Sequence, residues 1–276
     1  MADKELVKKL QEQAKTIRLT LLEMIYKAQS GHPGGSLSAT DFMTALYFNE
    51  MKVDPENPKW EDRDRFVLSK GHVCPVLYTC LGLKGYFAKE NLFTLRQEGS
   101  ILQGHPDMKR CPGIDISTGS LGQGISVAVG MAIAGKRDEK DYRVFTLLGD
   151  GETNEGQVWE AAQTASKYQL DNLVVIIDNN NLQNDNSCDV VMPTLDIAKK
   201  FEAFGFETYT INGHNMEEIV DALTAAREKS GKPKCIVGKT IKGKGVSFME
   251  NVVMWHGMAP NEKEYTQAIK DIKEGF

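Results

Sequence analysis

The sequence predicts an α/β fold, a largely parallel sheet with helices on both faces in a three-layer αβα arrangement. Helical and extended patterns alternate along the chain, and two extended runs, residues 144–148 and 173–177, consist almost wholly of apolar side chains. Such runs are typical of strands that are buried on both faces of a sheet. A helical pattern over residues 155–170 lies between them. A strand, a helix and a strand at this spacing form a βαβ unit, whose two strands are parallel.

The other elements follow from apolar periodicity and from the positions of glycine and proline. Before the βαβ unit we expect a long amphipathic helix over 6–28 that ends at Gly31 and Pro33, a second helix that begins after Ser38 or Thr40 as N-cap and runs to about 51, a strand over 65–68, a helix over 75–83, a loop over 99–119 and a buried helix over 121–134. After it we expect helices over 195–204 and 216–229, extended segments over 207–211 and 235–240, and a polar helical tail over 261–276. No linker or repeat divides these elements, so we expect one domain over residues 1–276.

The composition is that of an ordinary soluble protein, with 41% hydrophobic and 26% charged residues. The formal net charge of -5 gives no basic footprint for nucleic acid. The first residues contain no apolar stretch that resembles a signal peptide or a membrane span. The five cysteines are scattered and odd in number, which disfavours structural disulfides. We therefore expect a cytoplasmic protein.

Polar side chains follow both strands of the βαβ unit. Gly149-Asp150-Gly151 comes directly after the first strand, and Asn180 follows the second. In parallel sheets, ligands gather where the strands end, so Asp150 and Asn180 are expected side by side. Carboxylate and amide oxygens suit Mg²⁺ or Ca²⁺, which take their remaining ligands from water and from phosphate groups. The matched placement of the two turns favours a metal-bound diphosphate over two unrelated turns.

Every histidine in the chain lies beside a glycine, which lets the backbone turn sharply or approach a ligand closely. The five are His32, His72, His105, His214 and His256. Each one alone is more simply explained as a satisfied loop or core residue, but the shared pattern favours a common pocket for some of them. His214 is the weakest candidate, because its turn is an ordinary one before a helix. The spacing of the histidines does not match a zinc site.

Two glycine-rich segments give weaker signals. Residues 119–124 open the small-residue helix, but Val127 stands where a dinucleotide fingerprint requires glycine, so the segment either cradles a cofactor edge or packs tightly on the sheet. The lysines at Lys239, Lys242 and Lys244 lack the spacing of a phosphate-binding loop of the Walker type. They either neutralise a phosphate or lie in a solvated loop, and the solvated loop is the simpler interpretation.

Taken together, these motifs resemble the thiamine diphosphate fingerprint, and within that group the transketolase family. The fingerprint is carried by Gly-Asp-Gly at 149–151 and Asn-Asn at 179–180. The transketolase context is carried by Ser-Gly-His-Pro-Gly-Gly at 30–35, by the segment 62–72 that ends in Lys-Gly-His, by Gly-His-Pro at 104–106, by 118–124 and by His-Gly at 256–257, all in the family's order. The resemblance covers residues 5–260, nearly the whole chain.

The resemblance implies a role for each matching position. Asp150, Asn180 and the backbone carbonyl of Leu182 would bind Mg²⁺ (or Ca²⁺). Gly149, Gly151 and His72 would hold the diphosphate, with His256 near both diphosphate and substrate. Gly119 and Leu121 would meet the aminopyrimidine. His32 and His105, with His256, would be catalytic, since they would hydrogen-bond substrate hydroxyls and assist proton transfer. Thiamine diphosphate itself would carry a two-carbon ketol unit from a ketose to an aldose.

One departure from the family decides the interpretation. Transketolases are more than twice as long, and the pyrimidine-binding domain with its activating glutamate and the phosphate-binding arginines has no match here. Because the chain starts at Met1 and finishes in a helix-like tail, we expect it to be a complete N-terminal subunit of a two-chain transketolase. The expected partner is a C-terminal subunit that carries the pyrimidine domain and the glutamate, in an α2β2 assembly that acts on sugar phosphates.

Other interpretations remain open at this stage. A different thiamine reaction would fit a 1-deoxyxylulose-5-phosphate synthase-like enzyme, a dihydroxyacetone synthase-like enzyme or the α-subunit of a 2-oxoacid dehydrogenase. The Gly-His-Pro contexts of His32 and His105 favour transketolase over the dehydrogenase. A non-catalytic thiamine diphosphate-binding module is disfavoured, because it would have no use for substrate-side histidines.

Overall fold

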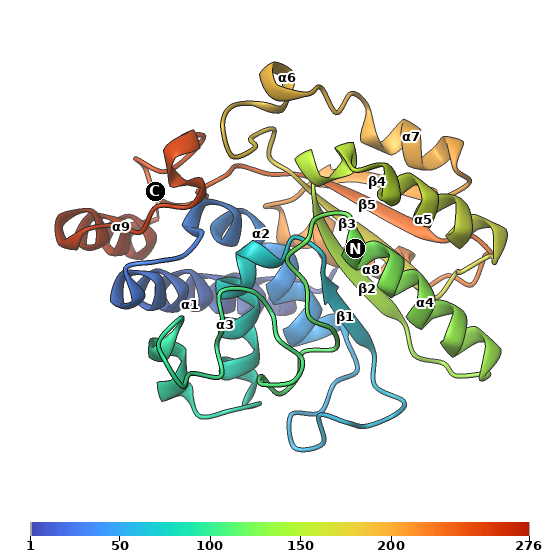
Figure 1. Ribbon diagram of the computed structural model, residues 1–276, viewed down its shortest axis with the longest axis horizontal. Helices are drawn as coiled ribbons and strands as arrows, with labels where there is room; N and C mark the ends of the chain where they lie inside the picture. The colour runs from blue at the N-terminus through green and yellow to red at the C-terminus, as the bar shows by residue number, and fades with distance from the viewer. Residues whose placement is uncertain (1, 276) are drawn as a thin grey trace.

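Five parallel strands form one sheet in the computed structural model, which describes residues 2–275 (Figure 1). They are β1 (Arg65–Leu68), β2 (Val144–Gly149), β3 (Leu173–Asn179), β4 (Glu207–Asn212) and β5 (Lys234–Lys239), in the spatial order β1-β2-β3-β5-β4. Every neighbouring pair is parallel, so the carboxyl ends of all these strands lie at one edge of the sheet. The predicted α/β class with a parallel sheet is confirmed.

Helices cover both faces of the sheet (Figure 1). One layer contains α1 (Lys4–Ala28), α2 (Pro33–Ala45), α3 (Cys74–Lys84), α8 (Met216–Ala225) and α9 (Glu262–Glu274), and the other contains α4 (Gln123–Arg137), α5 (Gly156–Lys167) and α7 (Ile197–Ala203). The short helical segments are η1 (Leu46–Glu50), η2 (Gly71–Val73), η3 (Lys89–Thr94), η4 (Gly151–Asn154), α6 (Cys188–Val191) and η5 (Val253–His256). None of the helices within residues 2–275 is both long and apolar enough to cross a membrane.

The sheet separates two hydrophobic cores. Along β2, Phe145 and Leu147 face the core shared with α1, α2 and α3, whereas Val144 and Leu148 face the core shared with α4 and α5. Successive side chains of a strand point to opposite faces, so each strand must be apolar at almost every position to fill both cores. This is the physical reason for the continuous apolar runs in the sequence.

The βαβ unit is confirmed: β2 and β3 are paired in parallel, and α5 lies between them in the chain. The helices expected over 75–83, 155–170 and 195–204 and the extended segments over 207–211 and 235–240 are present, with ends that differ by a few residues. The helix expected over 216–229 ends earlier, at Ala225. The first helix ends at Ala28 because Gln29 takes a left-handed conformation with φ of 47°.

The expected start of the second helix is wrong. Helix α2 begins at Pro33, because proline has a φ that suits the first turn of a helix and needs no hydrogen bond there. The hydroxyls of Ser38 and Thr40 do not cap the helix. Ser38 Oγ donates to the carbonyl of Gly35 and to the carboxylate of Asp178, and Thr40 Oγ1 donates to a carbonyl one turn back. Both residues therefore lie inside the helix.

The glycine-rich helix also differs from its prediction. Helix α4 begins at Gln123, two residues later than expected, because its N-cap Gly122 adopts a left-handed conformation with φ of 81°. Leu121 precedes the helix, and its side chain is 38% exposed. The helix is buried along one stripe that includes Ile125, Ala128 and Ala132, and Gly130 is exposed. It is thus an amphipathic surface helix rather than a fully buried one.

Candidate functional site

A cavity of about 550 Å³ lies at the carboxyl edge of the sheet. Most of the residues selected from the sequence line it, namely His72, Leu121, Gly149, Asp150, Gly151, Asn180, Leu182 and His256. They come from the ends of β2 and β3, from η2, from the segment before α4 and from η5, which are far apart in the chain. The parallel pairing of β2 and β3 puts their polar ends beside each other, as expected for a ligand site in an open α/β sheet.

Three oxygen-bearing groups that could bind a metal line this cavity: the side chains of Asp150 and Asn180 and the carbonyl of Leu182. The carboxylate of Asp150 is 2% exposed and accepts hydrogen bonds from the backbone N–H groups of Gly151, at 2.7 Å, and of Asn181. Asn180 Oδ1 accepts from the N–H of Leu182 at 3.1 Å, which turns the amide toward the same space. Burial raises the pKa of Asp150, and the negative charge of Asp178 raises it further. A buried carboxylate in this condition suits a cation, because a positive charge would offset the cost of its burial.

The Leu182 carbonyl already attracts a positive charge in this structure. It accepts a hydrogen bond from the ammonium of Lys242 at 3.0 Å, and the carbonyl of Gln183 accepts from the same ammonium at 3.2 Å. Each oxygen of this donor set keeps a further lone pair, so Asp150, Asn180 and Leu182 fit a hard divalent cation. Among residues 2–275, no group of three or more His, Cys, Asp or Glu side chains is arranged to hold a metal.

Lys242 is buried and lines the cavity, so a solvated loop is the wrong interpretation for this lysine. Its Nζ lies 2.6 Å from His256 Nδ1. Burial lowers the pKa of Lys242 to about 8, and the nearby ammonium of Lys70 contributes to the lowering. Lys239 is exposed, and Lys244 pairs with Glu250 at 3.0 Å. One lysine of the run therefore faces the cavity as a cation that pairs with no carboxylate of the described residues.

Three histidines form a cluster at the same place. The ring centroids of His32, His72 and His256 lie 5.1 to 5.5 Å apart. Burial lowers the pKa of His32 to about 4 and that of His256 to about 3, and it holds the pKa of His72 well below its ordinary value. All three rings are therefore neutral at pH 7 and act as hydrogen-bonding groups. His32 Nδ1 is buried without a hydrogen-bond partner among residues 2–275.

His105 and Gly119 lie together outside the lining of this cavity. A Cβ atom on Gly119 would stand 2.9 Å from Cδ2 of His105, and Gly119 has φ of 144°, so only glycine allows this ring so close to the backbone. His105 borders a neighbouring depression with Pro106 and Asp107. Burial lowers the pKa of His105, and the guanidinium of Arg96 adds to the effect.

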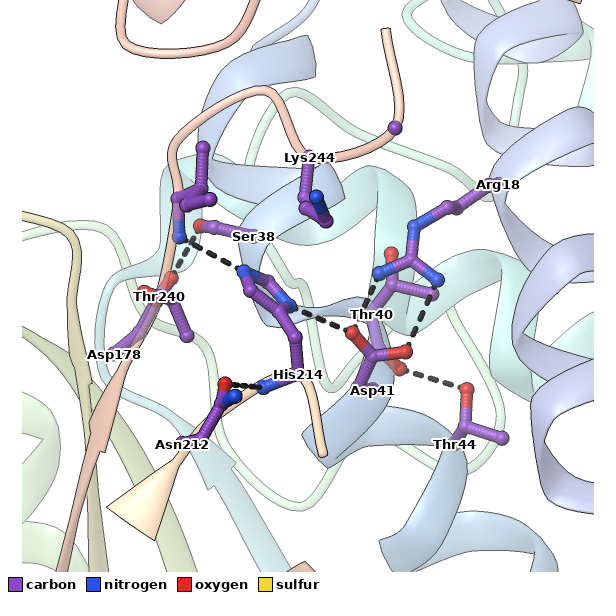
Figure 2. A network of polar contacts seen from close by, with 12 residues as sticks. Arg18, Ser38, Thr40, Asp41, Thr44, Asp178, Asn212, His214, Thr240 and Lys244 are labelled. Carbon is purple, nitrogen blue, oxygen red and sulfur yellow. Dashed lines mark hydrogen bonds and ion pairs between the residues drawn. The ribbon is translucent and has the colours of Figure 1, made fainter. Parts of the chain in front are cut away.

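His214 is not part of the cluster. Its ring contacts Asp41 on α2 and the backbone of Ile241 in the loop that follows β5, residues 240–246, called here the β5 exit loop (Figure 2). It lines a different cavity, with Arg18 and Lys244. The sequence pattern therefore identifies two histidines that line the cavity, His72 and His256, and a third, His32, whose ring packs against both. His105 lies outside this lining, and His214 belongs elsewhere.

Sequence reasoning missed three buried charged residues of the site. Lys70 forms an ion pair with Asp178, and the two side chains are 3% and 0% exposed. Glu152 accepts hydrogen bonds from Ser69 Oγ, from the N–H of Gly122 at 2.9 Å and from the N–H of Gly149 at 3.1 Å. Each of the three residues lies at or just beyond the end of a strand, and that position is the signal that could have found them.

The arrangement can bind an anionic ligand through a metal. It combines hard oxygen donors, a buried lysine that no described acidic side chain neutralises and neutral imidazoles at one edge of the sheet. Residues 9–275 match the profile of the family described as the thiamine diphosphate-binding domain of transketolase. The chain belongs to the transketolase family.

Relatives of similar length support this assignment in detail. The chain is 48% identical to the 6-deoxy-6-sulfo-D-fructose transketolase subunit of Clostridium sp. over 96% of this chain and 97% of the relative. It is 44% identical to an apulose-4-phosphate transketolase subunit of Phocaeicola vulgatus over 97% of this chain and 95% of the relative. The predicted class, an N-terminal transketolase subunit, is confirmed by these relatives.

Solved transketolases have the same fold in one part of a longer chain. The crystal structure of the Campylobacter jejuni transketolase matches with a TM-score of 0.91 at 38% identity, over 96% of this chain and 42% of that one. The chain thus spans about two fifths of the solved transketolase.

Proposed function

We propose that the chain is the diphosphate-binding subunit of a cytoplasmic two-chain transketolase, which transfers a two-carbon ketol unit from a ketose to an aldose with thiamine diphosphate and Mg²⁺. The observation that carries the proposal is the cavity that Asp150, Asn180 and Leu182 line together with two neutral histidines, His72 and His256. This is a place for a metal-bound diphosphate beside groups that can handle protons and hydroxyls.

The residues at the metal end have the simplest roles. Asp150, Asn180 and the Leu182 carbonyl hold Mg²⁺. We propose Mg²⁺ rather than Ca²⁺, because few protein ligands are present and phosphate oxygens would complete the coordination shell. Gly149 and Gly151 leave the backbone bare beside the diphosphate. A Cβ atom on Gly151 would come within 2.8 Å of Gln183, which supports the need for glycine there.

The histidines take the remaining roles. His72 and His256 donate hydrogen bonds toward the diphosphate, and Lys242 supplies a positive charge. His256 Nδ1 accepts from the Lys242 ammonium, so the proton of the neutral ring lies on Nε2. When bound, thiamine diphosphate supplies the nucleophilic carbon that attacks the sugar carbonyl. His32, His105 and His256 orient the sugar hydroxyls and move protons at the reacting oxygens, with Gly119 and Leu121 beside the aminopyrimidine.

The names of the relatives support the proposed partner and substrate class. Both relatives of similar length are named as subunits, which supports a second chain. We propose that this second chain carries the pyrimidine domain and its glutamate and that the assembly is α2β2. The names of the two relatives specify a sulfo-sugar and a sugar phosphate. We extend this to a substrate class: a ketose with an anionic group at the end remote from the carbon that is attacked.

The test is reconstitution with the partner, a protein of about 300 residues that carries the pyrimidine domain. The purified chain alone is expected to give no ketol transfer from xylulose 5-phosphate to an aldose phosphate. The mixture is expected to give transfer that requires both thiamine diphosphate and Mg²⁺. Transfer by the chain alone would contradict the two-chain proposal. Turnover of pyruvate in place of the ketose would contradict the transketolase reaction.

A further inference from the structure

A buried polar network links helices α1 and α2 to the loop that follows β5 (Figure 2). Both oxygens of Asp41 on α2 accept from the guanidinium of Arg18 on α1, at 3.0 and 2.6 Å. One of them also lies 2.8 Å from Nδ1 of His214. On the other side of the ring, Nε2 of His214 lies 2.8 Å from the backbone nitrogen of Ile241. The side chains of Arg18, Asp41 and His214 are 8 to 12% exposed.

The chemistry of the network fixes the tautomer of His214. A backbone N–H can only donate, so Nε2 must accept from Ile241 and cannot carry a proton. The ring proton therefore lies on Nδ1, where it is donated to the carboxylate of Asp41. Burial by itself would raise the pKa of Asp41, but the charge of Arg18 and the bonds from Arg18 and His214 outweigh it and lower the pKa. Asp41 thus stays ionised and holds the ring in the accepting tautomer.

The turn that carries His214 has little room to move. The backbone N–H of His214 donates to Asn212 Oδ1 at 3.0 Å, and the N–H of Gly213 donates to the carbonyl of Lys239 at 2.8 Å. A Cβ atom on Gly213 would stand 2.5 Å from Thr240 and 3.0 Å from Phe42. The ring is therefore fixed relative to both β5 and α2.

The residue that the ring holds is next to the lysine of the cofactor cavity. Ile241 lies between Thr240, whose hydroxyl donates to Asp178, and Lys242, whose ammonium contacts the Leu182 carbonyl and His256. The following N–H, of Gly243, donates to the carbonyl of Gly34 at 2.9 Å. The loop is thus pinned at successive residues, and the His214 bond comes one residue before Lys242.

We propose that His214 is a positioning residue, which Asp41 locks in one tautomer so that its Nε2 holds the Ile241 amide and places Lys242 against the Leu182 carbonyl and His256. The ring touches neither metal nor diphosphate, and it acts through the backbone of the β5 exit loop. The effect on cofactor affinity rests on the proposed function, but the effect on the loop does not.

Two substitutions separate the two bonds of the ring. In His214→Asn, the side-chain amide can reach the position of Nδ1 and still donate a hydrogen bond to Asp41. No atom remains at the position of Nε2, so the bond to Ile241 is lost. In His214→Gln, the longer side chain can present its oxygen at the position of Nε2 and keep the bond to Ile241. Glu50→Gln is the matched control, because Glu50 is also a buried carboxylate paired with arginine and lies at the far end of the α2–η1 segment.

The first readout uses the free protein. Amide hydrogen exchange of the peptide over residues 239–246 is expected to rise about tenfold in His214→Asn and to stay within about twofold of wild type in His214→Gln and Glu50→Gln. The ¹⁵N shifts of the wild-type His214 ring are expected to show the neutral Nδ1–H tautomer. An Nε2–H tautomer, or equal exchange in the Asn and Gln variants, overturns the proposal.

The second readout is calorimetric affinity for thiamine diphosphate with Mg²⁺, measured with the partner subunit present. The affinity of His214→Asn is expected to fall about tenfold, whereas His214→Gln and Glu50→Gln stay within about twofold. Wild-type affinity in His214→Asn despite faster exchange overturns the link to the cavity. If the wild-type protein itself binds no thiamine diphosphate, the proposed function fails, and the exchange result alone still decides the role of His214 in the loop.

Discussion

Two buried charged sites, one at each end of the sheet, differ in how far the protein neutralises them. At the amino end, the carboxylate of Glu50 accepts hydrogen bonds from Arg143 at 2.7 Å and from Arg227 at 3.0 and 2.7 Å. Its negative charge is therefore neutralised by guanidinium groups of the same chain. At the carboxyl end, the ammonium of Lys242 bonds to carbonyls and an imidazole, and the carboxylate of Asp150 has a raised pKa because it is buried.

This difference identifies the ligand site on physical grounds. A buried charge that is neutralised by the protein stabilises a junction between elements, whereas one that is left incompletely neutralised is stabilised when a ligand arrives. The α2–η1 segment connects the two ends of the sheet, since it ends at Glu50 and begins beside the histidine cluster at His32. Substitutions at the two ends of the sheet test this contrast.

The largest effect is expected at the carboxyl end, for Asp150→Asn. Loss of the proposed charged metal ligand should weaken Mg²⁺-dependent binding of thiamine diphosphate by at least about 100-fold. The melting temperature of the free protein should change little, because two effects offset each other. Asparagine removes the cost of burying a negative charge, but its NH₂ group cannot accept one of the backbone hydrogen bonds that the carboxylate accepts. Calorimetric titration and thermal melts measure the two quantities. Unchanged affinity would remove Asp150 from the metal site.

The matching change at the amino end is Glu50→Gln. It should lower the free energy of unfolding by about 2 kcal/mol, because a neutral amide cannot neutralise two guanidinium groups or accept all of their hydrogen bonds. The affinity for thiamine diphosphate should stay within about twofold, because the two ends of the sheet do not share contacts. Denaturant titration gives the first value. A large loss of affinity in this variant would show that the two ends are coupled and would break the contrast.

A smaller effect is expected for Lys242→Met, which removes the buried cation of the cavity. Affinity for thiamine diphosphate should fall about tenfold, equivalent to about 1.4 kcal/mol, while the free protein keeps its stability because burial disfavours the charged lysine. Lys244→Met is the control from the same loop, since Lys244 pairs with Glu250 outside the cavity. Equal losses in the two variants would argue against a specific role for Lys242.

The smallest effect is a pH dependence of stability. His32 and His256 have folded-state pKa values lowered to about 4 and about 3, below the unfolded value of 6.5. Below pH 6.5 the unfolded chain therefore binds protons that the folded chain does not, so stability falls as pH falls toward 4. After allowance for partial exposure, each ring lowers the free energy of unfolding by about 0.5–1 kcal/mol over the first pH unit below 6.5. Thermal melts from pH 7.5 to 5.5 should show a shallower decline in His32→Gln, and an identical decline would contradict this origin.

The sequence could predict the sheet and the polar turn at the end of β2, because both depend on local patterns. The apolar runs of β2 and β3 specify burial on both faces, and the position of Asp150 follows from the end of β2. The start of α2 was missed because Ser38 resembles an N-cap, although its hydroxyl bonds to Asp178 on β3. A local pattern cannot distinguish these two uses of a hydroxyl.

The burial of Lys242 could not be predicted from the sequence for a similar reason. The groups that enclose it, Leu182, Gln183 and His256, come from segments that are distant in the chain. Its neighbours Lys239 and Lys244 have the same local composition but face elsewhere. The histidines were found more readily because each stands beside a glycine, a local signal of close backbone approach.

Glu152 restricts how the walls of the cavity can move apart. Its carboxylate joins the segment after β1 at Ser69, the start of α4 at Gly122 and the end of β2 at Gly149. These three walls of the cavity cannot separate one at a time without leaving part of a buried acid unpaired. They are expected to open as a single cooperative unit, so cofactor entry depends on the other walls, the loops around Lys242 and η5.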